Sequence, residues 1–224
     1  MSVGKKLNAT FFLMIFLLCI VVGITFINLG NIEEKTEEAL DNRVEQIRTA
    51  DQIRFDLAMQ GLYARALMID GSKQNEDNLA LYQKSLDEDI VYLKKLARSE
   101  IMQQYLGDMV KFNDNFNTYA EQMLDAYHAD NTNLATQIVN TTLQEANVGI
   151  LETTNKIVKY QEKRLAIISD ETSAIVTSSK TISIIVLVIS ILVVIALIIY
   201  VRRTITKPLN LVVQEANIIA DGDL

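Results

Sequence analysis

The sequence predicts an all-α protein, in which an antiparallel four-helix bundle is anchored in a membrane by a spanning helix at each end. Half of the 224 residues are hydrophobic, while only eight are glycine and one is proline, a composition typical of long helices. Two long stretches carry no charge. Between these stretches, apolar residues recur every three or four positions, which is the spacing of one helix face.

The two uncharged stretches predict the membrane spans. Residues 181–201, TISIIVLVISILVVIALIIYV, are 21 residues long, and a helix of that length crosses a hydrocarbon core of roughly 30 Å. The first span is placed at residues 9–30. It could instead be a cleavable signal peptide, because two lysines precede it. Its apolar core exceeds the usual length of about 7 to 15 residues and no A-x-A site follows, so an uncleaved anchor is favoured.

Positive charges near the spans predict the orientation. Two lysines precede the first span, and Arg202, Arg203 and Lys207 follow the second. Because short cytoplasmic flanks carry the excess of Lys and Arg, residues 1–8 and 202–224 are both expected in the cytoplasm of a cell (inner or plasma) membrane protein.

The segment between the spans, residues 31–180, is expected on the extracytoplasmic side of the membrane as one four-helix bundle. Residues 30 to 181 hold 16 Lys plus Arg against 25 Asp plus Glu, a net charge of −9 that argues against nucleic-acid binding. The single cysteine, Cys19, lies in the first span, so no disulfide framework is expected.

Heptad-like seams predict the four bundle helices. The first seam averages 3.5 residues per step and comprises Leu40, Val44, Ile47, Ala50, Ile53, Leu57, Gly61, Ala64 and Met68. The second comprises Leu79, Tyr82, Leu86, Ile90, Leu93 and Leu96, and the third comprises Met102, Tyr105, Met109, Phe112, Phe116, Tyr119, Met123 and Ala126. The fourth comprises Val139, Leu143, Ala146, Ile150, Thr153, Ile157 and Tyr160. Short connections make consecutive helices antiparallel.

Turn residues predict where the helices end. Gly71 can adopt the left-handed conformation that ends the first helix, and Asn75 is expected to cap the second. Ser99 is expected to cap the third, and Asp130 or Asn131 the fourth. The fourth helix then has no proline before residue 201, so it is predicted to run without a break into the second span, over roughly 100 Å.

The only proline marks a predicted joint beyond the second span. Apolar positions resume at Ile205, Leu209, Val212, Ala216 and Ile219, again in steps of four and three. Pro208 fits the first turn of this new helix, where its missing N–H has no intrahelical partner, and it also permits a bend.

These residues resemble a known linker. Arg202-Arg203-x-Ile205-x-x-Pro208-Leu209, followed by Ile219-Ala220-Asp221-Gly222-Asp223-Leu224, is similar to the first helix of a HAMP domain. With one bundle between two spans, the whole chain resembles the sensor half of a bacterial methyl-accepting chemotaxis receptor of the four-helix-bundle class, truncated within the HAMP linker. The resemblance implies a homodimer that contacts the chemotaxis kinase and adaptor only through a cytoplasmic part beyond Leu224. It also implies that the signal-relay residues are Arg202, Arg203, Pro208, Leu209, Gly222, Asp223 and Leu224.

Three arginines of the first bundle helix are candidate ligand-binding residues. Arg43, Arg54 and Arg65 lie eleven residues apart and therefore share one stripe, with neighbours about 16 Å apart. Ordinary ion pairs are the alternative for each. The resemblance implies that arginines of this helix bind carboxylates of small ligands across a dimer interface, helped by the last helix. The expected ligand-binding residues are Arg65, Arg54, Thr141 and Thr142, since the fork of Arg suits a carboxylate.

No catalytic or metal-binding constellation is evident, so no enzyme activity and no cofactor are expected. His128 is the only histidine and is expected to be solvated in its turn, because a metal site needs several ligands. The Tyr and Phe residues of the third helix could line an aromatic pocket, but core packing is favoured.

The expected function is transmembrane chemoreception of a small molecule or a ligand-carrier protein. The same front end also precedes membrane histidine kinases and diguanylate cyclases, which remain the alternative. A third interpretation is a membrane anchor whose bundle only holds a dimer together.

Overall fold

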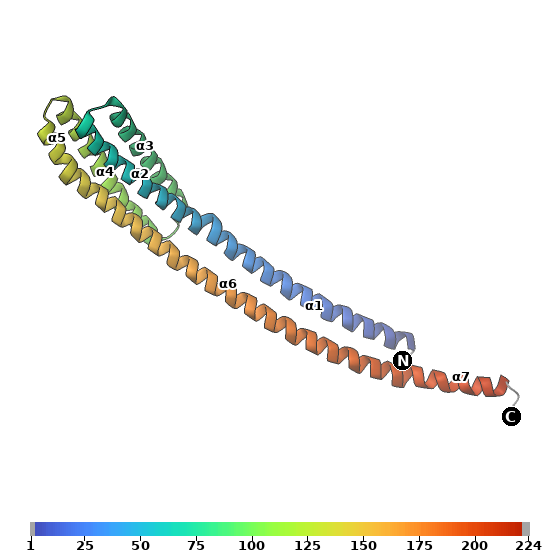
Figure 1. Ribbon diagram of the computed structural model, residues 1–224. Coiled ribbons are helices and arrows are strands. Elements are labelled where there is room, and N and C mark those ends of the chain that lie inside the picture. Colours follow the sequence, from blue (N-terminus) through green and yellow to red (C-terminus); the bar gives the residue numbers. More distant parts are fainter. Residues whose placement is uncertain (1–2, 221–224) are drawn as a thin grey trace. The chain divides into compact units, whose positions relative to one another are not determined.

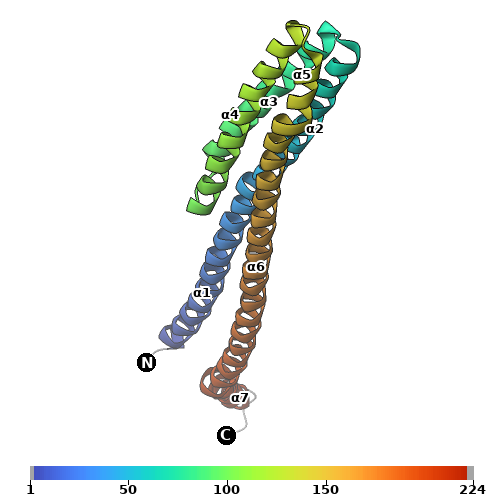
Figure 2. The same ribbon diagram turned by 90° about the vertical axis from the view of Figure 1, so that its left-hand side faces the viewer.

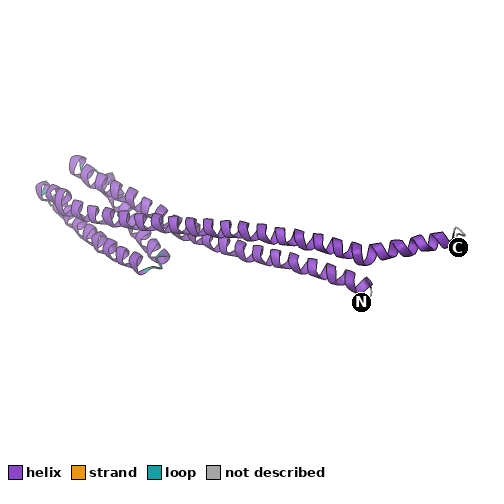
Figure 3. Cartoon of the chain, turned by 90° about the horizontal axis from the view of Figure 1, so that it is seen from below, coloured by secondary structure: helices purple, strands orange, loops and turns teal. Residues whose placement is uncertain are grey.

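The computed structural model describes residues 3–220, and nearly all of them are helical (Figure 1). No strand occurs in this range, which confirms the all-α prediction (Figure 3). The helices are α1 (Val3–Glu37), α2 (Glu45–Asp70), α3 (Lys73–Leu96), α4 (Glu100–His128), α5 (Thr132–Ile138), α6 (Gln144–Val201) and α7 (Lys207–Ala220). Three π-helical segments join some of them: η1 (Glu38–Val44), η2 (Val139–Leu143) and η3 (Arg202–Thr206).

The chain divides into two compact units. Residues 36–169 form one unit, a bundle in which α2, α3, α4 and the α5–η2–α6 run lie side by side with alternating directions (Figures 1 and 2). The other unit comprises residues 1–35 and 170–224. This second unit contains the apolar parts of α1 and α6.

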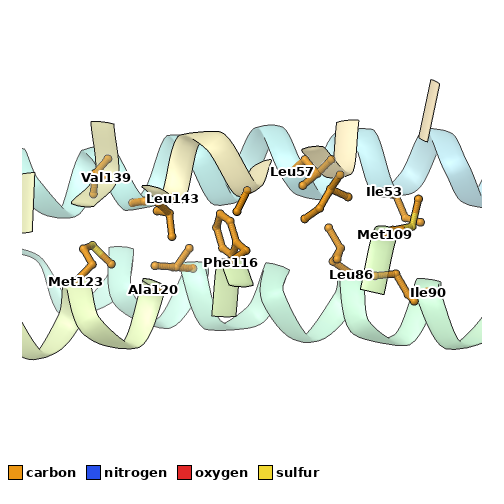
Figure 4. Packing of buried hydrophobic residues seen from close by; sticks show 14 of the residues in the cluster. Ile53, Leu57, Leu86, Ile90, Met109, Phe116, Ala120, Met123, Val139 and Leu143 are labelled. Atoms are coloured by element: carbon orange, nitrogen blue, oxygen red, sulfur yellow. The ribbon is translucent and has the colours of Figure 1, made fainter. Parts of the chain in front are cut away.

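The core of the bundle consists of apolar side chains from all four helices. Phe116 of α4 points toward Leu57 and Leu143, and Leu86 and Ile90 of α3 face α2 (Figure 4). The members of the four predicted seams that are buried are Ala50, Ile53, Leu57, Ala64, Leu79, Leu86, Ile90, Leu93, Met102, Met109, Phe116, Met123, Ala126, Val139, Leu143, Ala146, Ile150, Thr153 and Ile157. Tyr105, Phe112 and Tyr119 pack against this core, so the core interpretation of the aromatic residues is confirmed.

The prediction that the first seam is buried from Leu40 onward was wrong for its first two residues. Leu40 and Val44 are 57% and 41% exposed. Both lie in η1, and a π-helical turn holds an extra residue compared with an α-helical turn. The phase of the helix therefore shifts, and the apolar face that is buried from Ala50 onward does not extend back through η1.

The turns follow the predicted positions, with one correction. Gly71 has φ +63° and ends α2, as predicted. The cap of α3 is Ser72 rather than Asn75: the Ser72 hydroxyl accepts the N–H of Asn75 at 3.3 Å. Ser99 caps α4 and Asn131 caps α5, both through side-chain oxygens that accept a backbone N–H.

The last helical run is continuous, as predicted. Residues from Thr132 to Val201 are all helical, and the only irregularity is the π-helical turn of η2. α6 alone is 58 residues long. Two helical runs, Phe11–Asp70 and Thr132–Gln214, are long and apolar enough to cross a membrane by length and composition.

The joint at the proline is a π-helical turn rather than a break. The N–H of Lys207 bonds the carbonyl of Arg202, five residues back, which widens the helix directly before Pro208. Such a turn accommodates the proline ring, which would otherwise clash with a preceding carbonyl. Leu209 and Val212 of α7 are exposed. Gly222, Asp223 and Leu224 lie outside the described residues.

Candidate functional site

A small cavity, open to the surface of the bundle, lies where α2 meets η2 and the beginning of α6. Its volume is about 200 Å³. The lining comes from α2, α4, η2 and α6 and comprises Leu57, Ala58, Gly61, Ala64, Arg65, Phe116, Val139, Leu143, Gln144, Asn147 and Val148. Arg65 is the only charged residue among them, so the cavity favours an anion.

Arg65 differs from the other two arginines of its stripe. Its Nη1 donates to the carbonyl of Gly61 at 3.0 Å, and no carboxylate within the described residues pairs with it. Arg43 instead pairs with Glu38 at 2.9 Å, and Arg54 pairs with Asp51 at 2.5 Å. Arg43 and Arg54 therefore fit the ion-pair alternative, whereas the guanidinium of Arg65 remains available to an anion.

Gly61 makes room for the arginine. A Cβ at this position would lie 3.2 Å from Nη1 of Arg65 and 3.9 Å from Nδ2 of Asn147. Asn147 donates that amide to the carbonyl of Leu57 at 3.0 Å and thereby connects α6 to α2 at the cavity wall. A glycine within a helix lowers helix stability by up to about 1 kcal/mol, and at this site it leaves space beside the guanidinium.

Thr141 and Thr142 lie in η2 but not among the lining residues. Their hydroxyls donate to the carbonyls of Gln137 and Ile138, at 2.7 and 3.4 Å. Arg54 is also outside the lining, since it donates to Asn155 of α6 at 2.7 Å. The structure thus brings only Arg65 of the four predicted ligand-binding residues to the cavity.

A second set of polar contacts joins α2 and α6 near the other end of the bundle. Gln46 and Gln161 are both fully buried, and Nε2 of Gln161 donates to Oε1 of Gln46 at 2.5 Å. Arg43 donates to Oε1 of Gln161 at 3.3 Å. Since buried amides need partners, these contacts fix the register between the first and last helices of the bundle.

His128 is exposed and lies 3.3 Å from Glu76. Lys73 also pairs with Glu76 and is the main cause that holds the pKa of this carboxyl below its usual value. No group of three or more His, Cys, Asp or Glu side chains that could hold a metal occurs in the described part of the chain.

A helical bundle with a small cavity between its first and last helices, built on helices that extend into apolar runs of membrane-spanning length, has the architecture of a membrane-associated sensory module. The chain belongs to the family described as four helix bundle sensory module for signal transduction, whose model matches residues 1–176. This match confirms the resemblance to the sensor domain of methyl-accepting chemotaxis receptors. Neither the comparison with curated proteins nor that with solved structures found a match.

No site role was assigned from the sequence to Gly61 or to the polar lining residues Gln144 and Asn147. Gly61 was assigned to the apolar seam, although a glycine four residues before an arginine, one helical turn away, could have indicated space for that side chain. Nothing in the sequence pattern distinguishes Gln144 and Asn147 from other polar residues of a helix surface.

Proposed function

We propose that the chain is the sensor module of a transmembrane chemoreceptor. The bundle lies on the extracytoplasmic side of the membrane, and both termini lie in the cytoplasm. Family membership supports the sensory role, and the positive flanks support the orientation. The observation that carries the proposal is the course of α6: Gln144 and Asn147 at its beginning line the cavity, and the same helix continues to Val201.

The proposed ligand is a small organic anion, which binds at the cavity beside Arg65. A guanidinium without a carboxylate partner can donate two parallel hydrogen bonds to a carboxylate. The volume of about 200 Å³ is below the roughly 300 to 1,000 Å³ of most ligand pockets. We propose that a second chain completes the site at this cavity.

The proposed homodimer uses an exposed stripe on the first bundle helix. Eight exposed residues recur there in steps of four and three: Val44, Arg48, Asp51, Phe55, Ala58, Leu62, Arg65 and Ile69. This is the spacing of a two-helix seam. The stripe includes Ala58 and Arg65 of the cavity wall, so a partner helix packed along it would lie at the cavity.

The proposed output is a small movement of α6 relative to α2. Bound ligand contacts both helices and so biases their packing, and shifts of about 1 to 2 Å between packed helices are common in such switches. The π-helical η3 and α7 would receive this movement as the HAMP relay, through Arg202, Arg203, Pro208 and Leu209.

Arg65→Ala tests the ligand site. We expect at least one compound in a panel of L-amino acids and small dicarboxylates to raise the melting temperature of the full chain in nanodiscs. Arg65→Ala should weaken binding of that compound about 10- to 100-fold, because a charge-assisted contact is worth about 1.5 to 3 kcal/mol.

The matched control is Arg54→Ala, which removes an arginine from the same helix without touching the cavity lining. This variant should keep the affinity of the wild type. Unchanged binding in Arg65→Ala, or equal losses in both variants, would remove the proposed site.

A further inference from the structure

Two carboxylates on neighbouring helices, neither of them among the residues that line the cavity, each have a buried oxygen without a donor in the described part of the chain. Asp56 of α2 is fully buried. Its Oδ1 accepts Nε2 of Gln52 at 2.9 Å, while its Oδ2 is buried and receives no donor from the described residues. Oδ2 of Asp89, on α3, is buried without a donor in the same way. An ionised carboxylate in such surroundings is costly unless it is paired or neutralised.

The charged groups around Asp89 do not neutralise the negative charge of its carboxylate. Asp56 and Arg48 act on it from α2, and Glu88 acts from α3 itself. Arg48 is the only cation among them; its side chain is 76% exposed and already pairs with Glu45 at 2.8 Å. Burial, reinforced by the negative charge of Asp56, raises the pKa of Asp89 to about 6.

We propose that Asp56 and Asp89 form a proton-binding site that couples the packing of α2 against α3 to the pH around the bundle. One bound proton removes the repulsion between the two carboxylates, and it turns one unpartnered oxygen into a hydrogen-bond donor. Loss of that proton leaves two negative charges between helices that must stay packed. Neither carboxylate lines the ligand cavity, so the site would give the module a second input.

The direction of the pH dependence follows from proton linkage. Because the carboxyl of Asp89 has a pKa near 6 in the folded chain and near 3.8 when unfolded, the folded chain holds more protons between these values. The contribution of Asp89 to the free energy of unfolding therefore falls as the pH rises from about 4 to about 6, and it stays low at higher pH.

Asp89→Asn removes the ionisable group and keeps the shape of the side chain. For the full chain in nanodiscs, we expect this variant to melt about 3 to 6 °C above the wild type at pH 7.5 and within about 1 °C of it at pH 4. The matched control is Asp108→Asn, an exposed carboxylate on α4, which should show no such pH-dependent difference.

The same melting difference at both pH values would overturn the proposal. Infrared spectroscopy provides a second measurement on the wild type: at pH 5.5 the band of a protonated, partly buried carboxyl should be present, and Asp89→Asn should lose it. Absence of that band from the wild type would also overturn the proposal. If Ca²⁺ or Mg²⁺ stabilised the wild type at pH 7.5 but not Asp89→Asn, the pair would be a cation site instead of a proton site.

Discussion

Replacing Gly149 with alanine is expected to lower the free energy of unfolding of the bundle by about 2 to 3 kcal/mol, the cost of overpacking a core. A Cβ at this position of α6 would lie 2.4 to 2.7 Å from three ring atoms of Phe112 on α4. These distances are far below van der Waals contact, so α4 and α6 must separate or the ring must move. Urea unfolding of the detergent-solubilised chain, followed by the near-ultraviolet circular dichroism of its tyrosines, measures the loss.

Gly107→Ala is the matched control, because a Cβ there meets nothing within 4 Å on the surface of α4. This variant should be as stable as the wild type or gain up to about 1 kcal/mol from the better helix propensity of alanine. Combining Gly149→Ala with Phe112→Leu should restore part of the lost stability. Equal stabilities of Gly149→Ala and Gly107→Ala would show that α4 and α6 do not pack as closely as described.

A cysteine at Leu62 is expected to form an intermolecular disulfide in most of the protein when membranes are treated with a mild oxidant. Leu62 is an apolar member of the exposed stripe and is 53% exposed. In a dimer whose two-fold axis runs along this stripe, residues of the stripe lie next to their own copies in the partner. Non-reducing gel electrophoresis of the Leu62→Cys chain, with Cys19→Ser removing the natural thiol, measures the cross-linked fraction.

Leu81→Cys is the control for this experiment, because Leu81 is equally apolar and 58% exposed but lies on α3, outside the stripe. It should cross-link only at the slow rate of random collisions. Comparable cross-linking of both variants would mean that the stripe on α2 is not the dimer contact.

The helices and most of the core follow from local sequence signals. A seam with an average step of 3.5 places Ile53, Leu57 and Ala64 in the core because helix geometry alone brings them to one face. Gly71, Ser99 and Asn131 have turn chemistry that few other residues provide, so the ends of the helices were predictable.

The π-helical segments were not predictable from the same signals. An extra residue in a helical turn rotates the side chains on its N-terminal side relative to those that follow. No particular residue type marks such a turn in the sequence. This is why Leu40 and Val44 were assigned to the buried seam although both are exposed. The exposed stripe of the first bundle helix was also overlooked, because it carries the charged residues Arg48, Asp51 and Arg65 among its apolar ones.

The cavity and the pair of Asp56 and Asp89 could not be predicted from the sequence for a different reason. Arg65 was found through a family resemblance, but Asn147 is 82 positions away in the sequence, and only the packing of α6 on α2 brings both to one cavity. Asp56 lies on a helix on which Asp51 and Asp70 are exposed, and no local pattern indicates that Asp56 is fully buried. Such contacts depend on which helix faces meet.

Cysteine labelling in intact cells tests most directly whether the chain is a sensor that crosses the membrane twice. In a Cys19→Ser background, a membrane-impermeant maleimide should label Gln74→Cys, at the beginning of α3, without permeabilisation. Thr206→Cys, in η3, should be labelled only after the cells are permeabilised. Labelling of both cysteines from the same side would contradict the account, because α6 would then not carry a signal from one face of the membrane to the other.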